Sequence, residues 1–431
     1  MKRKLVALFT AVAMVSVMIA GCGGSAQEAP ASSAAPASSE AASAPAADPA
    51  APEGEFKVGA VLVGDENEGY TFAHIDGIQK AAAKLGIADS QIVWKYTVLE
   101  DESCKDAIVD CIEQGCQLVI TNSYGHQSFA EAAAEEHPDV QIVSMTGDTA
   151  QSSGLPNFKN AFTNIYEARY VGGIVAGLKL AELEEQGKLG ANNIDADGNV
   201  KIGYVGAYPY AEVVSGYTAF FLGIKSVYPN VAMEVKYTNT WFSITDEANA
   251  AKALIDNGCV IIGQHADSTG APDTCETALK NGTTVYSVGY NVDMLSVAPT
   301  AALTSPTNEW AIYYEYAFKT AMEGGSIDTD WAKGFADEAV AITPLGESCA
   351  PGTQEAVDAA IAALKDGSLQ VFDVTTFTVG GEQVETAFAS DTDGDWVNDA
   401  DEAIIDGYYH ESYFRSAPSF SLRIDGITED Q

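Results

Sequence analysis

Basic residues are scarce in this chain of 431 residues, in which 22 Lys and Arg stand against 61 Asp and Glu and the formal net charge is −39. Nucleic acids bind proteins through phosphates that require a basic surface, so this composition argues against a nucleic-acid partner. It also argues against a bare polyanion as a ligand. An excess of carboxylates is instead typical of a solvated surface that keeps an exported protein soluble.

The chain also has few of the patterns that build metal or nucleophilic sites. Its five histidines and seven cysteines include no Cys-x-x-Cys pair, which disfavours a zinc site. It has no Gly-x-Ser-x-Gly motif, so nothing in the sequence supports a hydrolase of the α/β type. Cys104, Cys111 and Cys116 lie on or beside one predicted helix. We expect them to be buried free thiols, although spacing alone leaves a disulfide open.

The apolar run at the N-terminus is too short to span a membrane. Three basic residues precede about 16 apolar residues, 5–20, and small residues follow them. A charged start, a short apolar core and small residues before a cut describe an export signal. We therefore predict a signal peptide over residues 1–21.

The predicted cut falls directly before a cysteine. Residues 19–22, Ile-Ala-Gly-Cys, resemble the lipobox of bacterial lipoproteins, which implies that Cys22 becomes the first residue and carries a lipid. The alternative is an ordinary signal peptide with an incidental cysteine. Residues 22–54 are mostly Ala, Ser and Pro and offer little to bury, so we interpret them as a disordered tether between a membrane and a folded body.

The rest of the chain alternates between short apolar runs and helical segments, as in the strand-like 57–64 followed by the helix-like 75–86. This alternation indicates parallel strands joined by helical crossovers. It restarts near residue 200, and the length of the chain suits two units. The sequence therefore predicts an α/β fold of two doubly wound parallel-sheet lobes. The first lobe would comprise 56–163 plus 300–325, and the second lobe 164–299 plus 326–431.

Ligands bind such sheets beyond the carboxyl ends of the strands. Residues 64–74, GDENEGYTFAH, follow the first predicted strand, and aromatics recur with amides and carboxylates at the other strand ends. A cleft with aromatic rings on both lobes suits a flat heterocycle, which stacks on the rings and is oriented by a few hydrogen bonds. We expect Tyr70 and Trp241 to be the stacking residues. The alternative for each is simple packing at the edge of a lobe.

A resemblance to a known family is carried by seven motifs in fixed order: VGDENEGYTFAHIDG, NSYGHQSFAEAAAEEHPDV, YEARYVGGIVAG, KIGYVGAYPYAEVVSGYTAFFLG, NTWF, QHADS and GYNVDM. They resemble the basic membrane lipoprotein (BMP) family of ABC-transporter substrate-binding proteins, closely over roughly residues 56–325. The resemblance implies a type I periplasmic-binding-protein fold, in which two lobes joined by three hinge crossings close on a ligand. The ligand is then carried to a permease and ATPase pair. Many members bind purine nucleosides or related bases.

The resemblance also implies site residues. The stacking aromatic after the first strand falls on Tyr70, the next polar contact on Thr71 and the second-lobe aromatic on Trp241. An acidic pair after the last strand of the second lobe falls on Asn291 and Asp293, so an amide replaces one carboxylate.

Two more positions depart from the family pattern, because Asn67 occupies an early acidic position and Thr307 occupies a basic one. The family residues at these positions serve the base edge and the ribose hydroxyls, so a nucleobase or another aromatic heterocycle is as plausible here as a nucleoside. We predict ten ligand-binding residues: Asn67, Tyr70, Thr71, Phe72, Tyr124, Trp241, Asp267, Asn291, Asp293 and Thr304.

A second acidic motif has the spacing of a calcium loop. Its carboxylates stand at positions 1, 3, 5, 9 and 12, with a backbone carbonyl at position 7, namely Asp391, Asp393, Asp395, Asp399, Glu402 and Val397. Trp396 occupies position 6, where the turn calls for glycine. We predict that no cofactor is required and that any bound Ca²⁺ would be structural. A solvated acidic turn is the alternative.

Together these features predict a lipid-anchored binding protein on the extracytoplasmic face of a bacterial cell membrane. It would deliver a small aromatic heterocycle, a purine nucleoside or nucleobase, to an ABC importer and would not be an enzyme. Two alternatives stay open. One is an exported α/β enzyme acting on nucleosides, and the other is a sensor that binds the same ligand without a role in transport.

Overall fold

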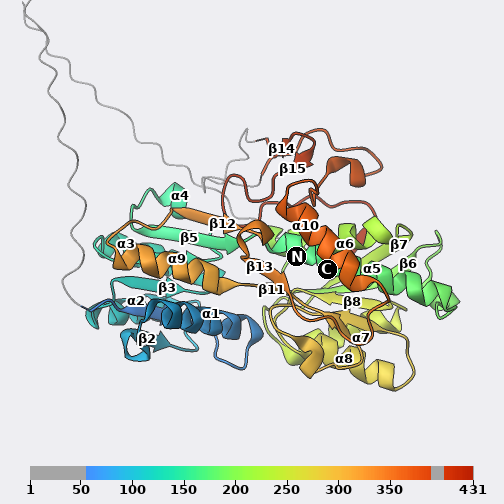
Figure 1. Ribbon diagram of the computed structural model, residues 1–431, viewed down its shortest axis with the longest axis horizontal. Helices are drawn as coiled ribbons and strands as arrows, with labels where there is room; N and C mark the ends of the chain where they lie inside the picture. The colour runs from blue at the N-terminus through green and yellow to red at the C-terminus, as the bar shows by residue number, and fades with distance from the viewer. Residues whose placement is uncertain (1–54, 390–401, 431) are drawn as a thin grey trace, which may run out of the picture. The chain divides into compact units, whose positions relative to one another are not determined.

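The computed structural model describes residues 55–389 and 402–430, which belong to one compact unit. Within the described residues, two six-stranded sheets lie side by side, each flanked by helices (Figure 1). Every neighbouring pair of strands in both sheets is parallel. The predicted α/β fold of two doubly wound parallel-sheet lobes is confirmed.

The first lobe is built on the sheet with strand order β12-β5-β4-β3-β1-β2. Its central strands read as continuous apolar runs because helices cover both faces of the sheet. Helices α1 and α9 cover one face, and α2 and α3 cover the other. The strands are β1 (Val58–Val61), β2 (Ile92–Lys95), β3 (Leu118–Thr121), β4 (Gln141–Met145), β5 (Phe158–Thr163) and β12 (Asp330–Lys333). The helices are α1 (Gly69–Leu85), α2 (Glu102–Glu113), α3 (Gln127–Glu136), α4 (Ala150–Ser153) and α9 (Trp310–Met322).

The second lobe repeats this plan with strand order β10-β9-β8-β6-β7-β16. Helices α5 and α6 pack on one face of the sheet, and α7 and α8 pack on the other. The strands are β6 (Val200–Gly206), β7 (Val231–Tyr237), β8 (Ile261–Gln264), β9 (Tyr286–Val288), β10 (Ala302–Thr304) and β16 (Ile427–Asp430). The helices are α5 (Ile165–Glu185), α6 (Ala211–Val227), α7 (Ile244–Asp256), α8 (Gly270–Lys280) and α10 (Thr353–Lys365).

Three chain crossings join the lobes. The first runs from β5 to α5, the second leads from β10 to α9 through β11 (Pro306–Asn308), and the third leads from β12 to α10 through β13 (Val340–Ile342). Strands β11 and β13 pair antiparallel, with Thr307 opposite Ala341. The crossings therefore include a two-stranded ribbon that can act as a hinge.

The predicted lobe boundaries are wrong at two strands. Strand β10 was assigned to the first lobe but pairs with β9 in the second sheet. Strand β12 was assigned to the second lobe but pairs with β5 in the first sheet, Trp331 opposite Ala161. The reason is packing, since Trp331 is buried in the first-lobe core, with its ring 5.0 Å from that of Tyr313.

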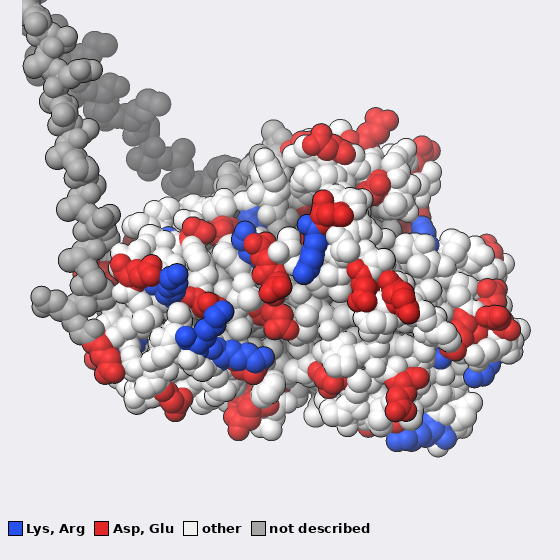
Figure 2. Space-filling model, viewed as in Figure 1, with Lys and Arg blue, Asp and Glu red and all other residues white. Residues whose placement is uncertain are grey.

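The described surface and cysteines agree with the sequence. Acidic side chains are spread over the visible face of the molecule and outnumber the basic ones (Figure 2). All six cysteines among the described residues are free, and Cys104, Cys111 and Cys116 are buried as expected. In residues 55–389 and 402–430, we find no helix with the length and apolar character needed to cross a bilayer.

Glycines allow α5 and α6 to approach each other closely at the base of the second lobe. A Cβ atom on Gly173 would lie 2.1 Å from the carbonyl oxygen of Phe220, and one on Gly223 would lie 2.0 Å from that of Tyr170. Both obstacles are backbone atoms of packed helices, which cannot rotate away as a side chain can. The two glycines therefore fix the spacing of these helices.

We predict that Gly223→Ala lowers the free energy of unfolding by about 3 kcal/mol or more, because overpacking at this site requires the helices to separate. Urea unfolding measures the change. Gly190→Ala is the matched control, since its Cβ atom would meet nothing closer than 3.6 Å and its φ is −91°. Equal stability of the two variants would contradict the close approach.

Candidate functional site

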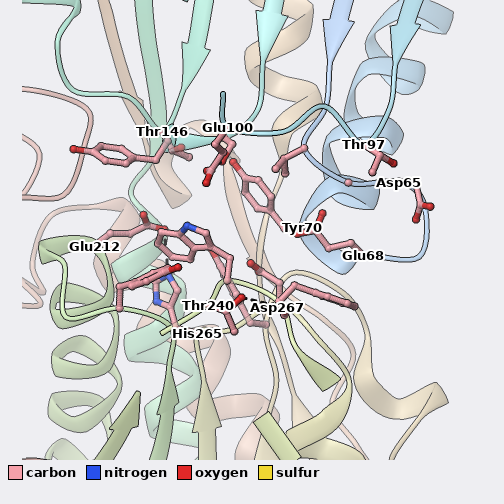
Figure 3. Close-up of a pocket in the computed structure, with 18 of the residues that line it drawn as sticks. Asp65, Glu68, Tyr70, Thr97, Glu100, Thr146, Glu212, Thr240, His265 and Asp267 are labelled. Atoms are coloured by element: carbon pink, nitrogen blue, oxygen red, sulfur yellow. Dashed lines mark hydrogen bonds and ion pairs between the residues drawn. The ribbon is translucent and has the colours of Figure 1, made fainter. Parts of the chain in front are cut away.

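A cavity of about 410 Å³ lies between the carboxyl ends of the strands of the two sheets (Figure 3). The first lobe contributes residues that follow β1, β2, β3 and β4. The second lobe contributes residues that follow β6, β7, β8 and β9. The lining residues are Val63, Gly64, Asp65, Asn67, Glu68, Tyr70, Thr97, Glu100, Ser123, Tyr124, Thr146, Tyr208, Glu212, Thr240, Trp241, Phe242, His265, Asp267 and Tyr290.

Aromatic rings line the cavity from both lobes. Tyr70 and Tyr124 come from the first lobe, and Tyr208, Trp241, Phe242 and Tyr290 come from the second. The ring of Tyr208 packs edge-on against Trp241, with 5.2 Å between centroids, and Tyr70 donates its hydroxyl hydrogen to the carbonyl of Asn122 at 2.5 Å. These contacts hold the rings in place before any ligand arrives. A flat ligand can therefore be sandwiched with little loss of side-chain freedom.

Five carboxyl groups line the cavity, those of Asp65, Glu68, Glu100, Glu212 and Asp267. Among the described residues that line it, none is Lys or Arg. Burial raises the pKa of Glu68 and raises that of Asp267 well above its usual value. A ligand that donates hydrogen bonds would relieve this desolvation, whereas an anionic ligand would add to the repulsion.

A buried cation lies behind the wall of the second lobe. Arg169 of α5 is buried, and its guanidinium carbon lies 3.9 Å from the centroid of the Tyr290 ring. Its Nη1 donates to the hydroxyl of Tyr204 at 2.6 Å and to the carbonyl of Gln264 at 2.9 Å. Arg169 therefore supports the aromatic wall from behind rather than facing the ligand space.

His265 is held in the neutral state. Burial, with a further contribution from the positive charge of Arg169, lowers the pKa of His265 to about 4. Its Nε2 lies 3.1 Å from Oε1 of Glu212, so a neutral ring can donate its hydrogen to that carboxylate. His265 and Glu212 form one polar wall of the cavity, facing Tyr70 and Glu68 across it (Figure 3).

Two threonines reach the cavity from strained backbone. Thr97 has φ of 55° and Thr146 has φ of 61°, values that a β-branched residue rarely adopts. Both follow strand ends of the first lobe. Strain of this kind persists only where the surroundings fix it, and it is concentrated at functional sites.

The structure brings five of the ten predicted residues to the cavity: Asn67, Tyr70, Tyr124, Trp241 and Asp267. They come from two strand ends of the first lobe and two of the second, as the topology predicted. Their convergence from distant parts of the chain is a feature of the structure. Their role in ligand binding stays a prediction.

The other five predicted residues lie elsewhere. Phe72 is 45% exposed, because residues two apart on α1 point to different sides, so Tyr70 faces the cavity and Phe72 does not. Thr71 is buried beneath the cavity, where it donates to Glu68 and accepts from Asn122. Thr304 is also buried and donates to the carbonyl of Thr343.

The acidic pair inferred from the family is also absent from the lining. Asn291 is buried behind the cavity and donates through Nδ2 to Oδ1 of Asp267 at 2.9 Å. Asp293 caps a short 3₁₀ helix, η4 (Met294–Ser296), by accepting from the backbone N–H of Leu295. Asn291 thus positions the carboxyl group of Asp267, and Asp293 has a local structural role.

Sequence reasoning missed the three glutamates Glu68, Glu100 and Glu212. Each stands within six residues of a predicted strand end, which was the available signal. In a chain with 61 Asp and Glu, a single carboxylate near a strand end cannot be distinguished by sequence from the many carboxylates of a solvated surface. Only the convergence of the strand ends shows that they face one space.

Five of the six predicted calcium ligands lie outside the described residues, namely Asp391, Asp393, Asp395, Val397 and Asp399. Glu402 is described, and its Oε1 accepts from the backbone N–H groups of Ala387 and Ile404 at 2.8 and 3.0 Å. Among the described residues, no group of three or more His, Cys, Asp or Glu is placed to hold a metal ion.

Glu247 of α7 supports the loop that carries His265 and Asp267. It is fully buried and accepts from the backbone N–H groups of Ser268 and Ser243 at 3.1 Å. Burial raises its pKa to about 7. Its carboxyl group is therefore protonated in the folded protein at pH values where the unfolded chain has lost the proton.

We predict that Glu247 contributes a stability that is fully present below about pH 4.5 and is lost as the pH rises through about 7. Relative to Glu247→Gln, the wild type should lose on the order of 3 kcal/mol of unfolding free energy between pH 4.5 and 8. Parallel urea titrations of both proteins measure the difference. A pH-independent difference would show that Glu247 is ionised in the fold.

The family model described as "ABC transporter substrate-binding protein PnrA-like" (Bmp) matches residues 57–362. A purine-binding protein of Brucella abortus is 32% identical over 274 residues, which cover 63% of this chain and 70% of that protein. A Haloferax volcanii protein, named provisionally as an ABC-transporter glucose-binding protein, is 28% identical over 302 residues, 69% of this chain and 68% of its own length.

Among solved structures, an ABC-transporter solute-binding protein from Aeropyrum pernix K1 superimposes with a TM-score of 0.60 at 14% identity, covering 74% of this chain and 93% of its own. At that identity the likeness establishes the fold. Two parallel-sheet lobes with a cavity between their strand ends place the chain in the class of proteins with this two-lobed fold.

Within that class, the chain belongs to the Bmp family of PnrA-like ABC-transporter substrate-binding proteins. The resemblance stated from the sequence motifs is thereby confirmed. Membership implies a small-molecule ligand and a permease and ATPase as partners.

Proposed function

We propose that this protein is the extracytoplasmic binding protein of an ABC importer and that its ligand is an uncharged purine nucleoside or nucleobase. The observation that carries the proposal is the cavity between the lobes, in which six aromatic rings surround a lining without Lys or Arg. Aromatic faces stack on a purine, and carboxylates accept from exocyclic amines, ring N–H groups or ribose hydroxyls. The purine-binding relative in Brucella abortus supports this ligand class.

A sugar is the second candidate. The Haloferax volcanii relative carries a name that refers to glucose, and carboxylates beside aromatic rings also suit sugar hydroxyls. The number of rings favours the purine, because the cavity offers rings from both lobes and from three strand ends of the second lobe, and a purine presents two aromatic faces on which they can stack. An experiment can separate the two directly.

The test is native mass spectrometry of residues 55–431, whose described part belongs to one compact unit, followed by denaturation and identification of any released compound. Protein stripped of ligand is then titrated by calorimetry with adenine, hypoxanthine, adenosine, guanosine and glucose. Release or binding of a purine supports the proposal. Binding of glucose with no response to any purine would overturn the purine assignment and leave the transporter class intact.

We predict that Trp241→Ala weakens binding of the identified ligand by about 1–3 kcal/mol, the range for loss of one aromatic stack on a base. Trp241→Phe keeps a ring in place and should retain most of the affinity. Calorimetry of the two variants beside wild type measures both effects. Unchanged affinity in Trp241→Ala would remove this ring from the binding site.

We further propose that a lipid on Cys22 anchors the protein, since the lipobox-like residues 19–22 precede a segment with the composition of a flexible tether.

Ca²⁺ binding by residues 391–402 is a separate proposal that rests on ligand spacing alone. If calcium binds, a chelator should lower the melting temperature and added Ca²⁺ should restore it, with Mg²⁺ as the control. No shift in either direction would reduce the segment to a solvated acidic turn.

A further inference from the structure

The C-terminal segment, defined here as residues 363–389 and 402–430, lies beyond the part of the chain that the family model matches. It packs on the second lobe. Strand β16 extends the second sheet beside β7, and the ring of Phe420 stacks on that of Phe372 at 4.3 Å between centroids. Strands β14 (Ile404–Ile405) and β15 (Tyr408–Tyr409) form a small hairpin in the same segment (Figure 1).

Residues 414–416 of this segment, which we call the clasp, bond to the first lobe. The carbonyl of Phe414 accepts from Nε2 of Gln151 at 3.0 Å. The guanidinium of Arg415 lies 3.4 Å from Oδ2 of Asp148. The backbone N–H of Ser416 donates to Oδ1 of Asp330, in β12, at 2.7 Å.

Both sides of the clasp are packed into the core of the second lobe. Tyr409 before it and Phe420 after it belong to the buried cluster that also holds residues of α5, α6, β6 and β7. The ring of Phe372, on which Phe420 stacks, lies 5.3 Å from that of Tyr166 in α5. The clasp is therefore a noncovalent connection between the lobes, in addition to the three chain crossings.

The clasp reaches the cavity through a shared carboxylate. The Oδ2 atom of Asp148 that faces Arg415 also accepts from the hydroxyl of Tyr124 at 3.4 Å, and Tyr124 lines the cavity. Gln127 holds the other oxygen of Asp148 at 2.9 Å. The side chains of Arg415 and Asp148 are only 8% and 17% exposed, so solvent screens this pair little.

The charge of Arg415 acts on the cavity residue itself. The pKa of Tyr124 is raised to about 12, first by burial and next by the negative charge of Asp148, while the positive charge of Arg415 opposes the rise. The three groups thus form one electrostatic unit. Arg415 belongs to the C-terminal segment on the second lobe, and Tyr124 lines the cavity.

We propose that Arg415 is a positioning residue for the interlobe cavity: by pairing with Asp148 it fixes the Tyr124 hydroxyl in the cavity wall and ties the lobes in the closed arrangement. The inference rests on the proposed function, because it treats this cavity as the ligand site. It adds a determinant of affinity from a segment outside the matched family region.

The first test is calorimetric titration with adenosine of wild type, Arg415→Gln, Asp148→Asn and the double variant. We expect each single variant to bind about tenfold more weakly and the double variant to be no weaker than either, because both remove the same interaction. Arg415→Lys, which keeps the charge, should recover part of the affinity. In a Tyr124→Phe background, the effect of Arg415→Gln should shrink.

The second test needs no ligand. Spin labels on Glu113→Cys in α2 and Thr277→Cys in α8, two exposed helix positions, report the distance between the lobes in a Cys349→Ser background. We expect Arg415→Gln and the isosteric Asp148→Asn to shift the distance distribution towards longer values. Arg423→Gln is the matched control, since Arg423 pairs with Glu429 in the same segment.

The outcomes are distinct. A longer interlobe distance together with weaker adenosine binding supports the proposal. A longer distance in a protein that binds no purine even as wild type supports the interlobe tie and refutes the proposed ligand class. Arg415→Gln and Asp148→Asn that match Arg423→Gln in distance and in affinity would overturn the proposal, even if their melting temperatures fall.

Discussion

The burial of carboxyl groups among aromatic rings is the constraint on which the interlobe cavity depends. Five carboxyl groups line a space without Lys or Arg, and burial raises the pKa of Glu68 and of Asp267. Removing carboxylates from water is costly unless donors replace the lost hydrogen bonds. A ligand rich in N–H or O–H groups meets this requirement, and a phosphorylated one works against it. The purine proposed as the ligand is such a neutral, donor-rich ring, and a nucleotide would not meet the requirement.

Under the proposed function, the same constraint couples ligand binding to a motion of the lobes. Glu68 and Glu100 belong to the first lobe, and Glu212 and Asp267 belong to the second. When the lobes separate about the β11–β13 ribbon, these groups return to water. Closure without a ligand brings like charges together at low dielectric, whereas closure around a donor-rich ligand compensates them. The charge distribution thus makes the closed state depend on the ligand, beyond any contribution from aromatic stacking.

The sequence predicted the fold more fully than the site, for physical reasons. Alternating apolar runs and helices specify parallel sheets, and the strand ends of such sheets converge, so Tyr70, Trp241 and Asp267 could be placed together. The side to which a residue points after a strand end depends on helix phase and local turns. That dependence took Phe72 and Asp293 out of the cavity.

The lobe to which each strand belongs and the charged residues of the cavity lining were harder still to predict from the sequence. Strand β12 joins the first sheet because Trp331 packs there, a long-range contact that no local pattern encodes. Glu212 and Glu100 look, in an acidic chain, like any solvated carboxylate. Arg415 has no local signal at all, since its partner Asp148 is separated from it by most of the chain. The region matched by the family model ends at residue 362, so it includes the aromatic rings of the cavity but not Arg415, which we propose positions the ring of Tyr124. Under that proposal, ligand affinity depends on residues outside the matched region as well.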